Sequence, residues 1–280
     1  MGRYLNPKSD LVFKKIFGEH PALLKSFLNA FLPLPENRLI EHIDYLPSEH
    51  VPEIPDFKST IVDVRCRDNF GRHFIVEMQL RWSANFMKRM LFNSACAYMH
   101  QLKKGEEYDT LCPVYGLSIV DAAFSNESEW FHHYRLTNTK NTEKTIDDIQ
   151  LVFLELPKFK PTTIIEKKLT ILWLRFLTEI DEDTRTVDAD LLASPEINEA
   201  LKYAEIAAYS PQEMRVYDAN WDAVSTEKTL MSDNFRAGKA EGKAEGKAEG
   251  LKEVARNLLI AGFDVAIVNQ IKEALSELGE

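Results

Sequence analysis

Two strand-like runs joined by a short turn, residues 61–80 (IVDVRCRDNFGRHFIVEMQL), constrain the fold of this chain more than any other feature. Apolar and polar side chains alternate in each run, which is the period of strands that bury one face. Asn69-Phe70-Gly71 suits a three-residue hairpin loop, with Gly71 at the position that needs a positive φ. This loop pairs residue i with residue 140 − i, so Asp63 lies opposite Glu77.

The register decides whether the two acids meet. In the predicted pairing, Asp63 and Glu77 share a polar face with Gln79, whereas a four-residue loop would put the acids on opposite faces. Two carboxylates and the Met78 carbonyl offer the oxygen ligands that a Mg²⁺-class ion prefers. Such an ion activates water for phosphodiester hydrolysis, and the uncharged Gln79 can orient that water. The alternative is a pair of solvated acids on an exposed hairpin.

The rest of the first 210 residues alternates between helical and strand-like patterns. A long helix is expected from Ser83 to Lys104, and residues 47–57, with three prolines, are expected to form an extended loop. The buried stripe of the long helix is predicted to comprise Met87, Leu91, Ala95, Tyr98 and Leu102. Further helices are predicted at 9–17, 22–31, 164–179 and 196–208, and strands at 114–120, 130–136 and 149–156. This order predicts a mixed α/β fold.

Charge is distributed unevenly along the chain. The net charge is −10, yet residues 58–104 contain nine Lys or Arg against three Asp or Glu, so the remainder carries −16. The predicted hairpin therefore lies in the basic part of an acidic protein, an asymmetry that favours binding of a polyanion there. The alternative is that both segments are solvated surfaces. Candidate phosphate contacts in this basic part are Arg65, Arg67, Arg81, Lys88 and Arg89.

Composition bears on where the protein acts. No apolar run approaches the roughly 20 residues of a membrane span. The opening MGRYLNPKSD is polar, and the three cysteines lack metal-ligand spacing. We therefore expect a cytoplasmic protein.

The C-terminal region changes character. Residues 237–250 read AGKAEGKAEGKAEG, a four-residue repeat in which glycine weakens any helix. The repeat is either a marginal helix that needs a partner or a flexible charged linker. Two short amphipathic helices are expected around Gly262. They form either a self-association element or a solvated tail.

The hairpin residues are similar to a known motif. IVDVRCRDNFGRHFIVEMQL resembles the D-(13–14)-E-X-Q core of the Rpn-like recombination-promoting nucleases and transposases, a branch of the PD-(D/E)XK nuclease superfamily. SDLVFKKIFGE resembles the N-terminal motif of that family, and AYMHQLKKGEEYDTLCPVYGLSIVDAAF and the glycine-punctuated tail are similar too. The resemblance covers most of the chain in the expected order.

The resemblance implies a restriction-endonuclease-like mixed sheet flanked by helices, with a C-terminal helical region, in a bacterial cytoplasmic protein. It implies a DNA endonuclease of recombination or mobile elements that depends on Mg²⁺, with Mn²⁺ or Ca²⁺ as alternatives. Asp63 and Glu77 match the metal-binding acids, and Gln79 matches the position that Lys holds in the wider superfamily. Asp10 and Lys14 match the N-terminal motif, where they assist metal or phosphate binding.

The expected organisation is a nuclease-like core at 1–160, a helical extension of the same domain at 161–234 and a tail at 235–280. The tail is the candidate element for homo-oligomer formation. The alternative function is a non-catalytic nuclease-fold module that binds or regulates, for example in phage defence. Metal-dependent nicking of plasmid DNA distinguishes the two.

Overall fold

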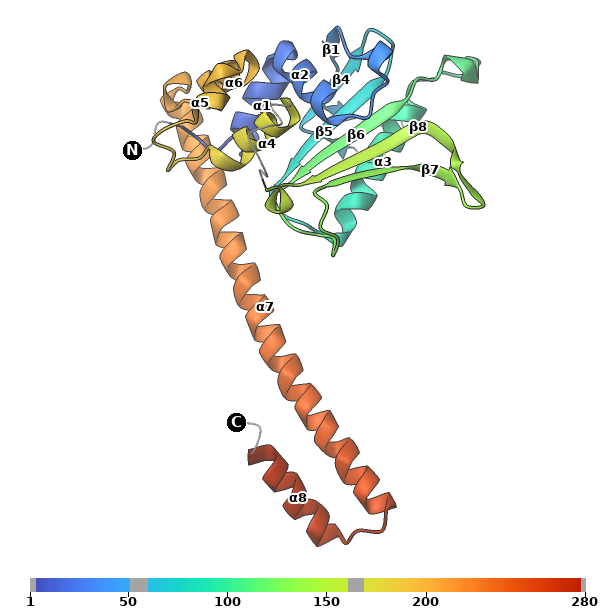
Figure 1. The fold of residues 1–280 in the computed structure, drawn as a ribbon, viewed down its shortest axis with the longest axis vertical. Coiled ribbons are helices and arrows are strands. Elements are labelled where there is room, and N and C mark those ends of the chain that lie inside the picture. The colour runs from blue at the N-terminus through green and yellow to red at the C-terminus, as the bar shows by residue number, and fades with distance from the viewer. Residues whose placement is uncertain (1–3, 51–59, 161–168, 278–280) are drawn as a thin grey trace. The chain divides into compact units, whose positions relative to one another are not determined.

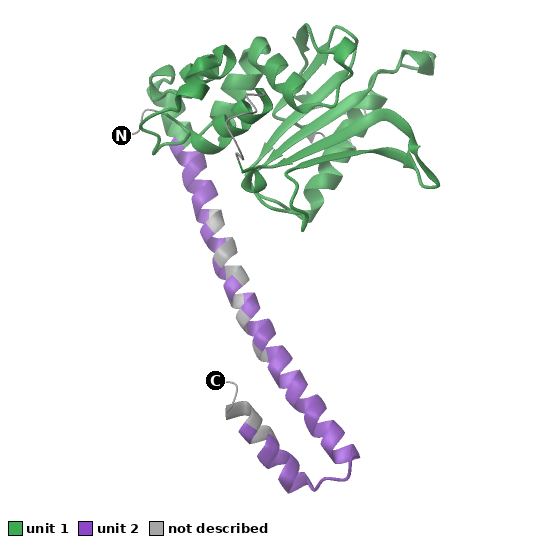
Figure 2. Cartoon of the chain, viewed as in Figure 1, with its two compact units in different colours: residues 1–217 green, residues 218–280 purple. Residues whose placement is uncertain are grey.

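The computed structural model describes residues 4–50, 60–160 and 169–277 of the chain. They belong to two compact units, residues 1–217 and residues 218–280 (Figure 2). Residues 51–57 of the predicted loop lie outside the described residues. Just before them, β2 (Glu49–His50) pairs with β3 (Thr60–Ile61) in a small antiparallel sheet.

A mixed six-stranded sheet forms the centre of the first unit, in the order β1-β4-β5-β6-β8-β7 (Figure 1). The central pairs β5–β6 and β6–β8 are parallel, and the outer pairs are antiparallel. With helices on its flanks, this sheet confirms the predicted fold class. Its strands are β1 (Ile43–Tyr45), β4 (Val64–Asp68), β5 (His73–Gln79), β6 (Val114–Val120), β7 (Phe131–Asn138) and β8 (Asn141–Glu155).

The β4–β5 hairpin has the predicted register. Val64 pairs with Val76 and Arg67 with His73, so the residue numbers of each pair sum to 140. The turn closes with hydrogen bonds from the Asp68 N–H to the Arg72 carbonyl (3.1 Å) and from the Gly71 N–H to the Asp68 carbonyl (3.0 Å). Gly71 has φ +77°, as the three-residue loop requires.

Helices cover both faces of this sheet. One face shares a hydrophobic core with α1 (Asp10–Glu19), α2 (Pro21–Phe31), α4 (Leu169–Glu179), α5 (Ala189–Ala193) and α6 (Pro195–Ala204). The other face packs on α3 (Ala84–Met99) through a second cluster that includes Ile75, Phe86, Met90 and Phe153. The connections include the short 3₁₀ helices η1 (Glu36–Arg38), η2 (Tyr108–Thr110), η3 (Leu156–Lys158) and η4 (Ile206–Ala208).

The predicted buried stripe of α3 is correct only in part, because Met87 and Tyr98 pack against the second cluster whereas Leu91 and Ala95 are exposed. Leu91 is 51% exposed, and the face that meets the sheet instead contains Phe86, Met90, Asn93, Ser94 and Ala97. Apolar spacing alone favoured the other face, but the Asn93 side chain donates a hydrogen bond to buried Glu77. A buried carboxylate without a donor costs more than an exposed leucine.

The helix also ends at Met99 rather than Lys104. Just beyond it, the Gln101 amide bonds both the N–H and the carbonyl of Cys112 at 2.9 Å. These two hydrogen bonds hold the chain in a loop, so the helical path cannot continue to Gly105.

The second unit is helical. α7 (Pro211–Ile260) begins in the first unit and runs through the glycine repeat, and α8 (Val265–Glu277) follows. Between them Gly262 has φ +89°, and the Gly262 and Phe263 N–H groups donate to the carbonyls of Leu259 and Leu258. This is a Schellman end to α7. Within the described residues no helix is both long and apolar enough to cross a membrane.

Candidate functional site

Asp63 lies immediately before β4, one residue beyond the last pair of the hairpin, Val64 with Val76. Its Oδ2 atom accepts a hydrogen bond of 2.8 Å from the Met78 N–H on β5. The N–H and carbonyl of one strand residue point to the same edge of the strand, so the Met78 carbonyl also faces the side on which Asp63 lies. The end of β5 thus brings a carboxylate and a backbone carbonyl to one place.

Glu77 is buried under α3, with only 5% of the residue exposed. Asn93 Nδ2 donates to Glu77 Oε1 at 3.3 Å, and Arg89 Nη2 donates to Glu77 Oε2 at 3.3 Å. Arg89 and Asn93 are four residues apart, so they lie on the same face of α3. Both hydrogen bonds are long for a charged acceptor, and therefore Glu77 is only partly satisfied.

Gln79 lies two residues beyond Glu77 and on the same face of β5. Its Oε1 accepts a hydrogen bond of 2.8 Å from the same Arg89 Nη2 that contacts Glu77. The Arg89 guanidinium also lies 4.9 Å from the centre of the Phe86 ring. Arg89 on α3 therefore bridges the side chains of Glu77 and Gln79.

The N-terminal motif residues approach from α1. The Ser9 side chain caps this helix and accepts from the Val12 N–H. Lys14 Nζ lies 2.7 Å from Asp10 Oδ1 and 3.7 Å from Asp63 Oδ1. Asp10 thus reaches Asp63 through Lys14, and each of the two central acids has a cation from a different flanking helix.

Electrostatics at this site favour an added cation. Burial raises the pKa of Glu77 to about 7, and the nearby Asp63 charge adds to the rise, although Arg89 and Asn93 oppose it. Burial also raises the pKa of Asp63 against the hydrogen bond from Met78 and the charge of Lys14. When all are ionised, the three acids Asp10, Asp63 and Glu77 outnumber the two cations Lys14 and Arg89.

The other predicted phosphate contacts are dispersed. Arg65 lies inside the sheet pairing and is 9% exposed, whereas Arg67 lies near the turn and its Nη2 is 3.7 Å from Asp44. Arg81 is half-buried just after β5, and Lys88 is exposed on α3. The structure brings Asp10, Lys14, Asp63, Met78, Glu77, Gln79 and Arg89 together, but not Arg65 and Arg67.

Sequence reasoning missed two neighbours of Glu77. Asn93 is one, and it was missed because it is not in the stripe of α3 that was predicted to be buried. Ser118 on β6 is the register partner of Glu77, and its buried hydroxyl has no hydrogen-bond partner among the described residues. A polar residue within an otherwise apolar strand, as in VYGLSIV, is a signal that marks such a position.

A second buried carboxylate lies on the same face of the sheet. Glu155 ends β8, and Val120 of β6 pairs with both Gln79 and Glu155. Glu155 Oε1 lies 2.7 Å from Ser125 Oγ, 2.7 Å from His132 Nε2 and 2.9 Å from Lys158 Nζ. Its Oε2 accepts from the Phe124 N–H at 2.8 Å. Burial alone would raise the pKa of Glu155, but the Lys158, Ser125 and Phe124 hydrogen bonds lower it to about 2.

The chain was compared with protein families, curated proteins and solved structures. A family described as PD-(D/E)XK nuclease family transposase matches residues 7–233, well over half of the chain, including Asp63, Glu77 and Gln79. No match is found among curated proteins or among solved structures.

Proposed function

Because the chain belongs to the PD-(D/E)XK nuclease family transposases, we propose that it hydrolyses DNA phosphodiester bonds as a metal-dependent endonuclease. The observation that carries this proposal is the pair Asp63 and Glu77. Glu77 is buried and Asp63 is half-buried, the pKa of each is raised, and the two carboxylates meet where β5 ends. In this reading the protein acts in recombination or on mobile elements inside the cell.

The donor set fits a hard divalent ion. Two carboxylates and the Met78 carbonyl are oxygen ligands of the kind that Mg²⁺ uses together with water. Among the described residues no group of three or more His, Cys, Asp or Glu is arranged to hold a metal, so we propose that water and substrate complete the coordination. The bound ion lowers the pKa of its water and neutralises charge on the phosphate. Mg²⁺ is our first choice, with Mn²⁺ or Ca²⁺ as alternatives.

The remaining residues then have separate roles. Gln79 orients the attacking water by hydrogen bonding. Lys14, held by Asp10, keeps the Asp63 carboxylate in place and adds positive charge at the α1 side of the site. Arg81 and Lys88 contribute phosphate contacts, which position the substrate without reading its sequence. We leave Arg65 and Arg67 out of this surface because one is buried and the other lies at the far end of the hairpin.

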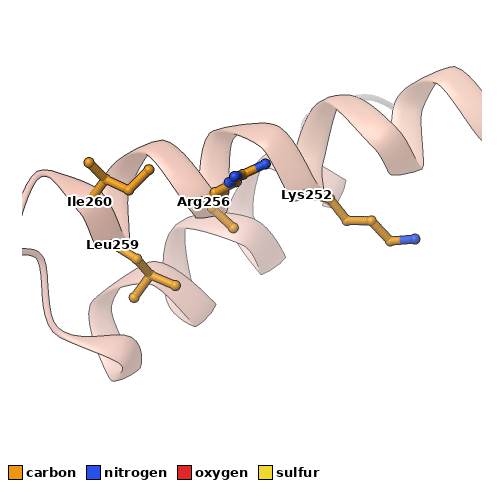
Figure 3. Close-up of a pocket in the computed structure, with 5 residues that line it drawn as sticks. Lys252, Arg256, Leu259 and Ile260 are labelled. Atoms are coloured by element: carbon orange, nitrogen blue, oxygen red, sulfur yellow. The ribbon is translucent and has the colours of Figure 1, made fainter.

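The tail is proposed to mediate self-association. Val254, Leu259, Ile260 and Phe263 are between 42% and 75% exposed, although they surround a well-capped turn. A shallow hollow in the last turns of α7 is lined by Lys252, Arg256, Leu259 and Ile260 (Figure 3). Replacing Leu259 and Ile260 by Asp in the full chain should lower the mass seen in sedimentation without removing cleavage. An unchanged mass contradicts this role.

The domain plan follows the same reasoning. We propose a helical extension of the nuclease core over 161–234, which is supported as far as Tyr217 because α4, α5 and α6 share one hydrophobic core with α1 and α2. Residues 218–234 belong to the second compact unit. We keep 1–160 as that core and 235–280 as the tail.

A second candidate function is a non-catalytic nuclease-fold module. The observation that favours it is the uncharged Gln79, at the position where the wider superfamily carries a cationic side chain. In that case DNA and metal would bind without hydrolysis.

The test is a plasmid-nicking assay with Mg²⁺ or Mn²⁺ titrated from zero, with Asp63→Ala as the control. Metal-dependent nicking by the parent and none by the variant supports the endonuclease. Nicking that survives both Asp63→Ala and Glu77→Ala contradicts the site, and metal-dependent DNA binding without nicking favours the second candidate.

A further inference from the structure

Position 79 leaves the proposed site short of positive charge. As the attacking oxygen bonds to phosphorus and the bond to the leaving oxygen breaks, negative charge is spread over the non-bridging oxygens. A fixed cation near those oxygens stabilises the transition state, and an amide such as Gln79 is neutral. Among the ion pairs of the described residues, Lys14 contacts Asp63 and Arg89 contacts Glu77. Lys14 is engaged by Asp10 and Asp63 on the α1 side, which leaves Arg89 on α3.

Arg89 is held in a defined position. Its Nη2 donates to Gln79 Oε1 at 2.8 Å and to Glu77 Oε2 at 3.3 Å, and its guanidinium packs against the ring of Phe86, which is 2% exposed. A side chain fixed at three points loses less freedom when it binds a further group. Arg89 is therefore preorganised at the end of β5.

The opposite edge of the same guanidinium is available. The Arg89 side chain is 51% exposed, and its Nε and Nη1 atoms make no hydrogen bond to any residue that the structure describes. A guanidinium presents several N–H donors in a planar fork that matches phosphate oxygens. Arg89 can thus hold Gln79 with one nitrogen and a phosphate with the others.

We propose that Arg89 is a catalytic residue, supplying from α3 the positive charge that position 79 lacks. Its free edge binds a non-bridging oxygen of the scissile phosphate while Nη2 keeps Gln79 and Glu77 in register. This inference rests on the proposed nuclease function. It gives Arg89 a role distinct from that of Arg81 and Lys88, which contribute to affinity.

The test combines three variants with a matched control. Arg89→Met keeps the contact with Phe86 and removes the charge, and Gln79→Lys/Arg89→Met returns a charge at position 79. Lys104→Ala removes an exposed positive charge beyond the end of α3 and controls for net charge. Single-turnover plasmid cleavage, DNA affinity in Ca²⁺ and Mn²⁺ affinity by calorimetry without DNA are measured for each, after thermal melts establish that each is folded.

We expect Arg89→Met to slow cleavage about 100-fold, as for loss of one transition-state donor. Its Mn²⁺ affinity should equal or exceed that of the parent, since a cation beside Glu77 is gone. The double variant should recover at least about tenfold of the lost rate. Lys104→Ala should behave as the parent.

Three results would overturn the inference: parental cleavage by Arg89→Met, Mn²⁺ affinity that falls in step with its rate, or no recovery in the double variant. The second result would mean that Arg89 only positions the ligands. A parent that binds Mn²⁺ yet cleaves no DNA overturns the proposed function itself, which is a different outcome from an active Arg89→Met variant.

Discussion

Glu77 and Glu155 are two buried glutamates on the same face of one sheet, with β6 between their strands, and their environments have opposite effects. The pKa of Glu77 is raised to about 7, whereas that of Glu155 is lowered to about 2. Burial acts in the same direction on both. The difference comes from the Asp63 charge, which raises the pKa of Glu77, and from hydrogen bonds. Glu155 has three partners within 2.9 Å of one oxygen, whereas Glu77 has only donors at 3.3 Å.

The contrast separates two uses of a buried charge. Glu155 is saturated by Ser125, His132, Lys158 and a backbone N–H, and so it fixes the segment after β6 against the end of β8. Glu77 is left under-satisfied beside a second acid, a state that costs stability and that a bound cation relieves. Glu155 therefore stabilises the fold, and Glu77 is the carboxylate that we propose as a metal ligand.

The largest expected effect is on cleavage. Glu77→Gln should slow DNA cleavage by about 10³-fold, because loss of the metal removes several kcal/mol of transition-state stabilisation. Glu155→Gln, assayed at a temperature where both variants are folded by circular dichroism, should cleave at close to the parental rate. Equal loss of cleavage rate in the two variants would contradict the proposal that Glu77 takes part in cleavage and Glu155 does not.

The next largest effect is on stability, where substitution of Glu155 should do more harm than substitution of Glu77. Glu155→Ala should lower the free energy of unfolding by about 3 kcal/mol, because buried His132 and half-buried Lys158 then lose their carboxylate partner. Glu77→Gln should be more stable than the parent at pH 8 in the absence of metal. Urea unfolding measures both, and a Glu155→Ala variant as stable as the parent would contradict the structural role.

Of the two glutamates, only Glu77 should contribute to stabilisation of the fold by a bound metal ion. At a free Mn²⁺ concentration of 100 times the dissociation constant, the parent should gain about 2.7 kcal/mol in unfolding free energy. The unfolding free energy of Glu155→Gln should be lower than that of the parent without Mn²⁺, but it should rise by the same amount when Mn²⁺ is added. The unfolding free energy of Glu77→Gln should rise by almost nothing. Thermal melts with and without Mn²⁺ test this, and stabilisation that persists in Glu77→Gln would place the ion elsewhere.

The two glutamates should also contribute in opposite directions to the pH dependence of the unfolding free energy. Glu77 binds its proton more tightly in the folded state, so its ionisation destabilises the fold as pH rises from about 4.5 to about 7. For Glu155 the contribution is present above about 4.5 and is lost as pH falls towards about 2. In the absence of metal, the difference in unfolding free energy between Glu77→Gln and the parent should grow by about 3 kcal/mol from pH 4.5 to pH 8. Because His73, whose pKa burial lowers to about 4, is common to both proteins, its titration cancels in this difference. A flat difference would contradict the raised pKa.

The smallest expected effect concerns Gln79. Gln79→Ala should slow cleavage by about three- to tenfold, the value of one hydrogen bond, and Gln79→Lys should be tolerated. Rates under saturating metal test this prediction. A Gln79→Ala enzyme as fast as the parent would show that the side chain has no part in catalysis.

Local patterns were sufficient for the hairpin. The alternation around Gly71 predicted its loop, its register and the approach of Asp63 to Glu77, because a positive φ and a period of two leave few alternatives. The family resemblance added Asp10 and Lys14. The environment of Glu77 was not predictable in the same way, since Arg89 and Asn93 reach it only through the tertiary placement of α3. That helix carries two faces of similar apolarity, so its spacing alone selected Leu91 over Asn93.

The parallel order β5–β6–β8 also determines when the proposed site around Glu77 can form during synthesis of the chain. All the proposed metal ligands and Arg89 precede residue 90, yet β5 is paired on one side by β6, and β6 is in turn paired by β8, which ends at Glu155. A chain leaving the ribosome from its N-terminus exposes the acids first and the strands that hold them last. In the proposed function, a shorter chain that ends before β8 lacks the strand pairing that supports β5, and we expect it not to cleave DNA.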